Sequence, residues 1–183
     1  MRARMALKQA SIACDIVEIS LRDKPPEMLA ISPKGTVPVL LLSDGTVIDE
    51  SRNIMDWALN QFDPDNWLVH DISLIKDNDS WFKHALDRYK YPARYPQEDC
   101  TGAQETVLKF LTLLNDRLIE TQFLSQDFVT LSDIAIFPFI RQAVNTDKDW
   151  FLSLPLSKLQ KWLDYCLNMS IFTHIMNKNL TNI

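Results

Sequence analysis

The chain has 183 residues, of which 46% are hydrophobic and 23% are charged, and its formal net charge is −5 at pH 7. These values are typical of a globular protein with a core, and they exclude disordered and fibrous chains. The acidic balance argues against nucleic acid as the main partner, because phosphate binding needs a basic face. No apolar run reaches membrane-spanning length, and the Met-Arg-Ala-Arg start lacks the apolar segment of a signal peptide, so we expect no membrane partner and no secretory signal.

The cysteines and histidines predict a reduced, cytoplasmic protein without a metal site. The three cysteines lie far apart and form no CxxC pair, which favours free thiols over a disulfide framework: Cys14, Cys100 and Cys166. The three histidines follow no HxxxH or HExxH spacing: His70, His84 and His174.

The first part of the chain alternates helical and extended patterns. Residues 1–12 carry an apolar stripe at helical spacing. Residues 14–19 have strand character, because β-branched residues alternate with acidic ones. Residues 21–34 form a proline-broken loop with room for one short helical turn at residues 27–31.

A β-hairpin and a helix follow this loop. Residues 37–42 are apolar, residues 43–45 form a Ser-Asp-Gly turn, and residues 46–48 resume an extended pattern. From Ser51 the apolar residues recur at helical spacing, so we predict that Ser51 is the N-cap of a helix.

The corner between this strand and this helix has polar groups suited to a zwitterion. Backbone N–H groups at the helix start and the hydroxyl of Ser51 suit a carboxylate, and Glu50 suits an ammonium. Pro38 cannot donate to a strand ladder, and it belongs at a strand start or an edge. If the Val37-Pro38 bond is cis, the backbone of Val37 is free to pair with an extended, peptide-like ligand.

The remainder of the chain reads as helical. A turn-rich joint at residues 63–67 separates it from the first part. Four helical segments follow, at residues 70–91, 103–124, 130–144 and 156–168, with a weakly helical tail from Ser170. Thr130 and Asp133 fit a capping box, which gives Asp133 a structural role. We therefore predict a first domain at residues 1–62, a linker at 63–68 and an all-helical domain at 69–183.

The predicted strand at residues 14–19 has no evident neighbour, because the strand that should precede the first helix is not in the sequence. A lone strand would leave its ladder groups unpaired. We expect either a preceding strand in the natural protein or another cover for this edge.

Three motifs occur in order at plausible distances: Gly35–Leu40 (GTVPVL), Asp49–Ser51 (DES) and Thr130–Ala135 (TLSDIA). With the element order, they resemble the cytosolic glutathione S-transferase family over essentially the whole chain. The resemblance implies an α+β/α two-domain fold, in which a thioredoxin-like domain lacking its first strand precedes an all-α bundle. The turn with Lys24-Pro25 at its start looks most like the omega and related cysteine-type branch.

The resemblance also implies a ligand and its contacts. The cysteinyl part of glutathione would pair with the backbone of Val37 before cis Pro38, and the γ-glutamyl end would be held by Glu50 and Ser51. Lys24 would approach the glycine end. A small electrophile or a mixed disulfide would be the second substrate, and a homodimer is expected.

The family's catalytic Cys, Ser or Tyr lies just before the first helix, where a helix N-terminus favours a thiolate. Met1-Arg2-Ala3-Arg4 resembles the residues that follow a Cys-Pro motif in cysteine-type members. We therefore expect the catalytic cysteine upstream of Met1 and assign no catalytic residue within the chain. Cys14 cannot replace it, because it lies at the far end of the first predicted helix.

Three functions fit these features. The first is glutathione-dependent thiol transfer or deglutathionylation through the upstream cysteine. The second is a non-catalytic binding or scaffold protein that keeps the fold. The third is a glutaredoxin-like reductase of protein disulfides, which needs the same thiol.

Overall fold

The computed structural model describes residues 1–177 and 182. They divide into two compact units, one formed by Met1–Leu68 with the segment from Ser170 onward, the other by Val69–Met169. The sequence places the tail from Ser170 with the helical domain, whereas in the structure its helix at Ser170–Ile175 groups with the first unit. No helix among the described residues is long and apolar enough to cross a membrane.

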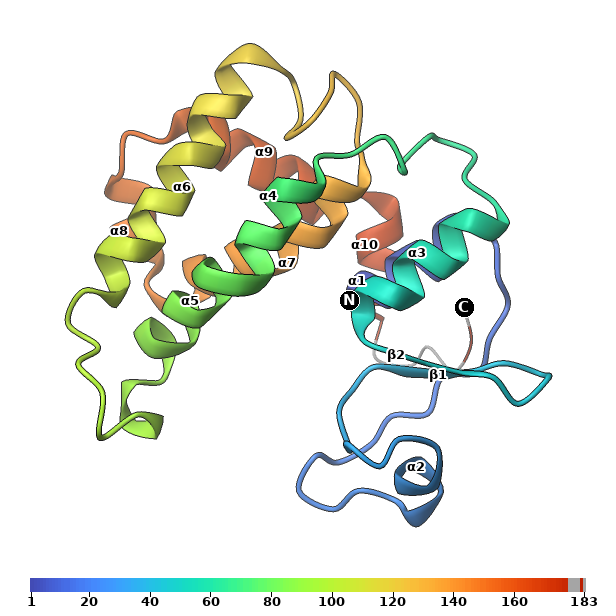
Figure 1. The fold of residues 1–183 in the computed structure, drawn as a ribbon. Helices are drawn as coiled ribbons and strands as arrows, with labels where there is room; N and C mark the ends of the chain where they lie inside the picture. Colours follow the sequence, from blue (N-terminus) through green and yellow to red (C-terminus); the bar gives the residue numbers. More distant parts are fainter. Residues whose placement is uncertain (178–181, 183) are drawn as a thin grey trace. The chain divides into compact units, whose positions relative to one another are not determined.

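The first unit combines a small antiparallel sheet with helices (Figure 1). Strands β1 (Val39–Leu41) and β2 (Val47–Asp49) pair Val39 with Asp49, Leu40 with Ile48 and Leu41 with Val47. The elements in chain order are α1 (Arg2–Gln9), α2 (Pro26–Ile31), β1 (Val39–Leu41), β2 (Val47–Asp49), α3 (Ser51–Gln61) and α10 (Ser170–Ile175).

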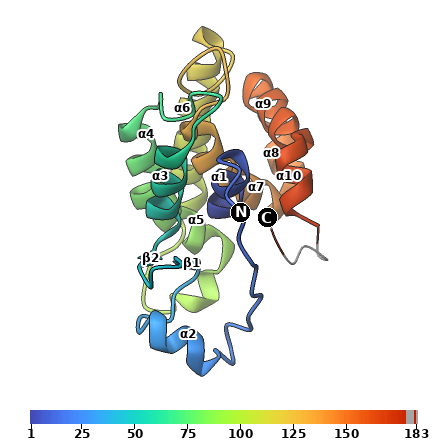
Figure 2. The same ribbon diagram turned by 90° about the vertical axis from the view of Figure 1, so that its right-hand side faces the viewer.

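Helix α1 is central to the core of the first unit. It packs against α3 on one side and contacts α10 as well, and Figure 2 shows α1 beside α3. The stripe that α1 buries includes Met5 and Ala6, and α3 contributes Ile54 and Met55. The apolar residues that recur at helical spacing in α1 and in α3 thus form one helix–helix interface.

The predicted hairpin is confirmed, and its turn has the expected chemistry. The amide of Gly45 donates to the carbonyl of Leu42, and the amide of Thr46 donates to the side chain of Asp44. Gly45 has a φ of 87°, which a residue with a Cβ rarely adopts. The short helical turn expected at residues 27–31 is also present, as α2.

The prediction of a strand at residues 14–19 is wrong. In the described residues this segment has no regular ladder, and its only bridge is between Asp15 and Asn182. Alternating β-branched residues favour extended backbone, but a ladder requires a neighbour. The described sheet contains β1 and β2, and neither pairs with this segment.

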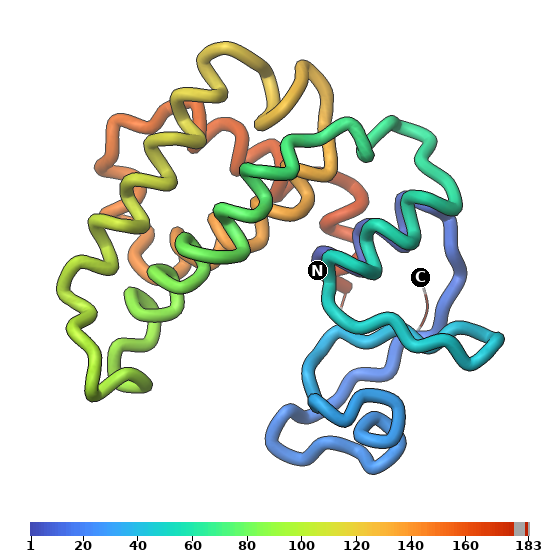
Figure 3. Tube along the Cα trace, in the orientation of Figure 1, coloured from blue at the N-terminus to red at the C-terminus, as the bar shows by residue number. Residues whose placement is uncertain are grey.

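The second unit is helical throughout its regular elements (Figure 3). Its elements are α4 (Ile72–Asp77), the π-helical segment η1 (Asn78–Phe82), α5 (Lys83–Lys90), the 3₁₀ turn η2 (Pro92–Arg94), α6 (Ala103–Glu120), α7 (Leu131–Thr146), α8 (Lys148–Ser153) and α9 (Ser157–Asn168). The predicted helix at residues 70–91 is thus one helical path that passes through a π-helical segment.

Helix α6 ends earlier than its apolar pattern predicts. The pattern continues to Leu124, but the helix stops at Glu120, and Thr121 is extended. Phe123 and Leu124 are still buried. The amide of Leu124 donates to the carboxylate of Asp133 at 3.0 Å, so a tertiary contact satisfies the group that a longer helix would have bonded.

Candidate functional site

The peptide bond between Val37 and Pro38 is cis. Val37 is exposed, and Pro38 is half-buried directly before β1. The register of the sheet begins at Val39, so Val37 lies beyond the paired residues. This arrangement matches the predicted strand start with a proline at its edge.

The backbone turns sharply at Glu50, between β2 and α3. Glu50 has φ 66° and ψ 132°, and its carbonyl accepts the hydrogen bond from the amide of Ile54. The prediction that Ser51 is the N-cap is wrong, because Ser51 is the first helical residue and Glu50 is the N-cap. The reason is that the backbone changes direction at Glu50, which has the positive φ, so the helix already begins at Ser51.

This corner leaves functional groups available. Glu50 is exposed, Ser51 is half-buried, and no side chain caps the start of α3 among the described residues. Uncapped N–H groups at a helix N-terminus attract anions. A positive φ in a residue with a Cβ costs about 1–3 kcal/mol, and such strain concentrates at functional sites.

The hairpin brings the two halves of the predicted site to one end. Because Val39 is paired with Asp49, the residues before Val39 and those after Asp49 lie at the same end of the antiparallel pair. Val37 and Pro38 therefore lie at the end of the hairpin where Glu50 and Ser51 begin α3.

Lys24 lies beside the loop that leads to Val37. A Cβ at Gly35 would come within 3.1 Å of the Lys24 Nζ atom, and Gly35 has a φ of 61°. The positive φ favours glycine here, and the absence of a Cβ leaves room for the end of the lysine side chain. The structure thus places the Lys24 side chain beside Gly35, which lies two residues before Val37 in the chain.

An ion pair that sequence reasoning missed connects the same segments. Lys34 Nζ lies 2.7 Å from Asp49 Oδ2. The hydrogen bond from Lys34 lowers the pKa of Asp49, and the same bond raises the pKa of Lys34. Asp49 was recognisable only as part of the DES motif, since no local pattern links it to a residue fifteen positions earlier. Both side chains are partly exposed to solvent, so the pair contributes little to stability.

Cys14 does not have the properties of an activated thiol. It is half-buried, and burial raises its pKa, as does the neighbouring carboxylate of Asp15. A raised pKa favours the thiol over the nucleophilic thiolate. Among the described residues no group of three His, Cys, Asp or Glu side chains could hold a metal ion.

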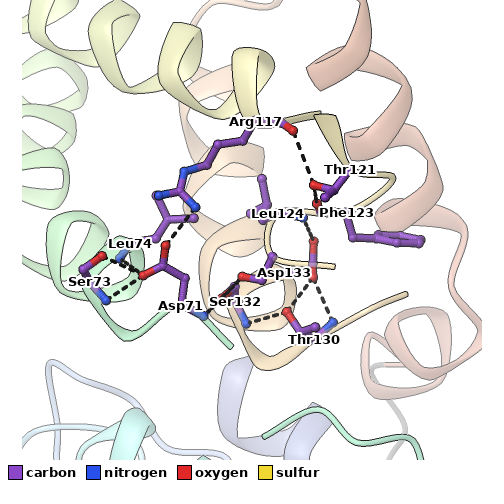
Figure 4. Close-up of polar contacts among 11 residues, drawn as sticks. Asp71, Ser73, Leu74, Arg117, Thr121, Phe123, Leu124, Thr130, Ser132 and Asp133 are labelled. Carbon is purple, nitrogen blue, oxygen red and sulfur yellow. Dashed lines mark hydrogen bonds and ion pairs between the residues drawn. The ribbon is translucent and has the colours of Figure 1, made fainter. Parts of the chain in front are cut away.

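Asp133 in the second unit has a structural role, as its capping-box pattern predicts. The carboxylate is fully buried and accepts from the amide and hydroxyl of Thr130, from the amide of Leu124 and from Trp162 Nε1 (Figure 4 shows the first three contacts). Burial raises its pKa despite these bonds. The partners Leu124 and Trp162 lie outside the capping box, so the motif alone could not identify them.

Comparison with known proteins supports the arrangement of the first unit. A family model described as the N-terminal domain of glutathione S-transferase matches residues 1–66. A probable glutathione transferase of Aplysia californica is 33% identical over 85 residues, which are 46% of this chain and 90% of that protein. Glutathione S-transferase omega-1 of Sus scrofa is 23% identical over 97% of this chain and 72% of its own length.

A solved structure shows the same fold across both units. Glutathione transferase F7 of Populus trichocarpa matches with a TM-score of 0.78 at 19% identity, covering 95% of this chain and 91% of that one. The thioredoxin-like first domain and helical second domain expected from the sequence are therefore confirmed. From the motifs, the family model and these relatives, the chain belongs to the glutathione S-transferase family.

Proposed function

We propose that the first unit binds glutathione at the corner between β2 and α3. The observation that carries this proposal is the strained, exposed Glu50 directly before an uncapped helix N-terminus. A strained residue that is not needed to cap the helix is best explained by a ligand contact.

In the proposed complex, each end of the tripeptide meets a group of matching charge. The γ-glutamyl ammonium binds the carboxylate of Glu50, and its carboxylate binds the hydroxyl of Ser51 and the first amides of α3. The cysteinyl backbone pairs with Val37 before Pro38 as an added strand would. The glycine carboxylate is approached by Lys24.

The proposed reaction is thiol transfer or deglutathionylation in the reducing cytoplasm. A cysteine thiolate attacks the glutathionyl sulfur of a mixed disulfide, the disulfide breaks, and the substrate leaves as a thiolate that takes up a proton. A second glutathione then attacks the protein–glutathione disulfide, releasing glutathione disulfide and regenerating the cysteine. In the cysteine-type branch that the chain resembles, the attacking cysteine lies just before the first helix.

The main alternative is a non-catalytic protein that uses the same corner to bind glutathione. In this alternative Cys14 does not supply a nucleophile, because burial raises the pKa of its thiol. The genomic sequence upstream separates the two functions. An in-frame Cys-Pro codon pair is expected for the enzyme, and a stop codon there would remove the upstream-cysteine mechanism.

The binding site is tested by calorimetry with glutathione on Glu50→Ala and Ser51→Ala. Each substitution is expected to weaken binding by about 1–3 kcal/mol, because a charged or polar hydrogen-bond partner of the ligand is lost. Asn60→Ala is the matched control, since Asn60 is an exposed polar residue near the other end of α3. Unchanged affinity in both site variants would rule out the assignment.

We also propose that the protein is a homodimer through the helices that begin near Ser51 and His70, as the family resemblance implies. Light scattering after size-exclusion chromatography is expected to give twice the mass of one chain. The mass of one chain at micromolar concentration would contradict this part of the proposal.

A further inference from the structure

The segment Arg88–Tyr95, which joins the end of α5 to the turn η2, alternates cations with tyrosines. The glutathione proposal uses none of these residues. Three of its cations lie over tyrosine rings, which is an unusual density of such contacts in an eight-residue segment.

Two of these cations share one ring. The Lys90 Nζ atom lies 4.8 Å from the centroid of Tyr91, and the guanidinium carbon of Arg94 lies 3.9 Å from the same centroid. A 3₁₀ turn that begins at Pro92 brings Arg94 back toward Tyr91, because the amide of Arg94 donates to the carbonyl of Tyr91 at 2.9 Å. The ammonium of Lys90 is anchored separately, by its hydrogen bond to Gln142 Oε1 at 3.1 Å. The two charges are thus positioned before any ligand arrives.

Neither of these two cations is neutralised by a described carboxylate. Lys90 donates to the uncharged Oε1 of Gln142 at 3.1 Å, and Arg94 forms no ion pair within the part of the chain that the structure describes. Arg88 is different. It lies over Tyr95 but is paired with Glu98, with 2.6 Å between Nε and Oε2.

Two positive charges on one ring lie within the screening length of about 10 Å at 0.1 M salt, so they repel each other. The negative face of the tyrosine ring offsets only part of this repulsion. An anion bound beside the ring would weaken this repulsion.

We propose that Lys90 and Arg94, held against Tyr91, form a binding site for a phosphate monoester. A phosphate monoester carries a charge of about −1.5 to −2 at pH 7, which matches the two cations. The planar fork of Arg94 fits two phosphate oxygens, and the ammonium of Lys90 supplies a point charge with donors left after its bond to Gln142.

A compact phosphate fits better than a polyanion. The whole chain has a net charge of −5, and Asp87, Glu98 and Asp99 lie close in sequence on either side of the pair. A long polyanion would extend into this acidic surrounding, whereas a single phosphoryl group needs only the two cations. Glutathione has no phosphate, so this site is independent of the proposed glutathione site.

Calorimetric titration of the full chain with phenyl phosphate, and separately with a phosphoserine peptide of neutral flanking residues, tests the proposal. We expect binding of at least one, with affinity at least tenfold lower in Arg94→Gln and in Lys90→Gln. Arg94→Lys is expected to recover part of the loss, because the charge returns without the fork. The ester that binds more tightly identifies the source of the phosphate group as a small metabolite or a phosphorylated protein.

Lys83→Gln is the matched control, since Lys83 is an exposed cation at the start of the same helix and makes the same change in net charge. It is expected to change affinity less than twofold. An equal loss in Lys83→Gln, tighter binding of duplex DNA than of both esters, or no binding of either ester by the unaltered protein would overturn the proposal. Unchanged thermal unfolding and unchanged glutathione affinity in the variants would show that the loss is local.

Discussion

Glu50 has a backbone conformation that glycine adopts far more readily than glutamate. With φ at 66°, its Cβ is crowded against the chain, yet the residue also presents an exposed carboxylate at the start of α3. Its side chain does not cap the helix, so its strain is not balanced by a capping bond. In the proposed complex, the carboxylate of Glu50 binds the ligand, and the strained backbone of Glu50 lowers the stability of the fold while it holds the carboxylate in place.

Glu50→Gly is therefore expected to raise the stability of the fold while it weakens glutathione binding. Removing the Cβ relieves the strain, and we expect the free energy of unfolding to rise by up to about 1 kcal/mol after the added flexibility of glycine is counted. Glutathione affinity should fall as in Glu50→Ala. Urea denaturation and calorimetry on one preparation would check both, and a glycine variant less stable than the alanine variant would contradict the strain account.

Helix α4 is joined to two other helices of the second unit through its N-cap. The Asp71 carboxylate accepts from the amides of Ser73 and Leu74 and pairs with Arg117 of α6 at 2.8 Å, while its amide donates to Ser132 of α7 (Figure 4). Burial alone would raise the pKa of Asp71, but the hydrogen bonds outweigh it and lower the pKa to about 2. The carboxylate therefore stabilises the packed helices only when it is ionised.

This network predicts a defined pH dependence. Because the folded-state pKa of Asp71 lies below its ordinary value of 3.8, its contribution is present above pH 4 and is lost as the pH falls toward 2. Asp71→Asn keeps a capping side chain, so we expect a loss of about 1 kcal/mol at pH 7, limited by solvent screening. The difference in unfolding free energy between the two proteins should shrink between pH 4 and pH 2. A difference that stays constant over this range, measured by urea denaturation, would contradict the role of the charge.

At the scale of the molecule, the first unit is built from both ends of the sequence. Helix α10, which follows the helical second unit in the chain, packs on α1, and it buries Phe172 and Ile175. The proposed glutathione corner begins α3, which packs on the other side of α1. The stability of the first unit thus depends on residues more than a hundred positions away.

Ile175→Ala is expected to destabilise the first unit selectively. Deleting a buried aliphatic side chain costs about 2–5 kcal/mol, and the cost falls on the unit that contains the cavity. Hydrogen exchange should show faster exchange of the α1 amides, while those of α6 stay protected. Met176→Ala is the control, because Met176 is 41% exposed, and it should leave exchange unchanged. Equal acceleration in both helices would show that the units unfold together.

Much of the fold and part of the site could be predicted from local patterns. The capping box at Thr130 and the glycine turn at Gly45 each follow from the chemistry of a few neighbouring residues. The cis bond before Pro38 was only one of the two possible forms, and the structure shows which one is present. The pairing of Lys34 with Asp49 and the contact of Asp133 with Trp162 could not be predicted, because each joins segments whose positions only the packed chain defines. The same holds for Lys90 and Arg94, whose shared ring depends on the turn between them.

Periodicity and the conformational limits of glycine and proline are local properties, so the helices, the hairpin and the polar residues at the corner can be predicted from the chain alone. Three features depend on packing instead: residues 14–19 form no ladder, Glu50 rather than Ser51 is the N-cap, and helix α10 groups with the first unit. Each of these outcomes depends on which neighbour a segment meets. Local propensity describes which structure a segment can form. The segments that pack against it determine whether its backbone groups are hydrogen-bonded and its apolar surface is buried.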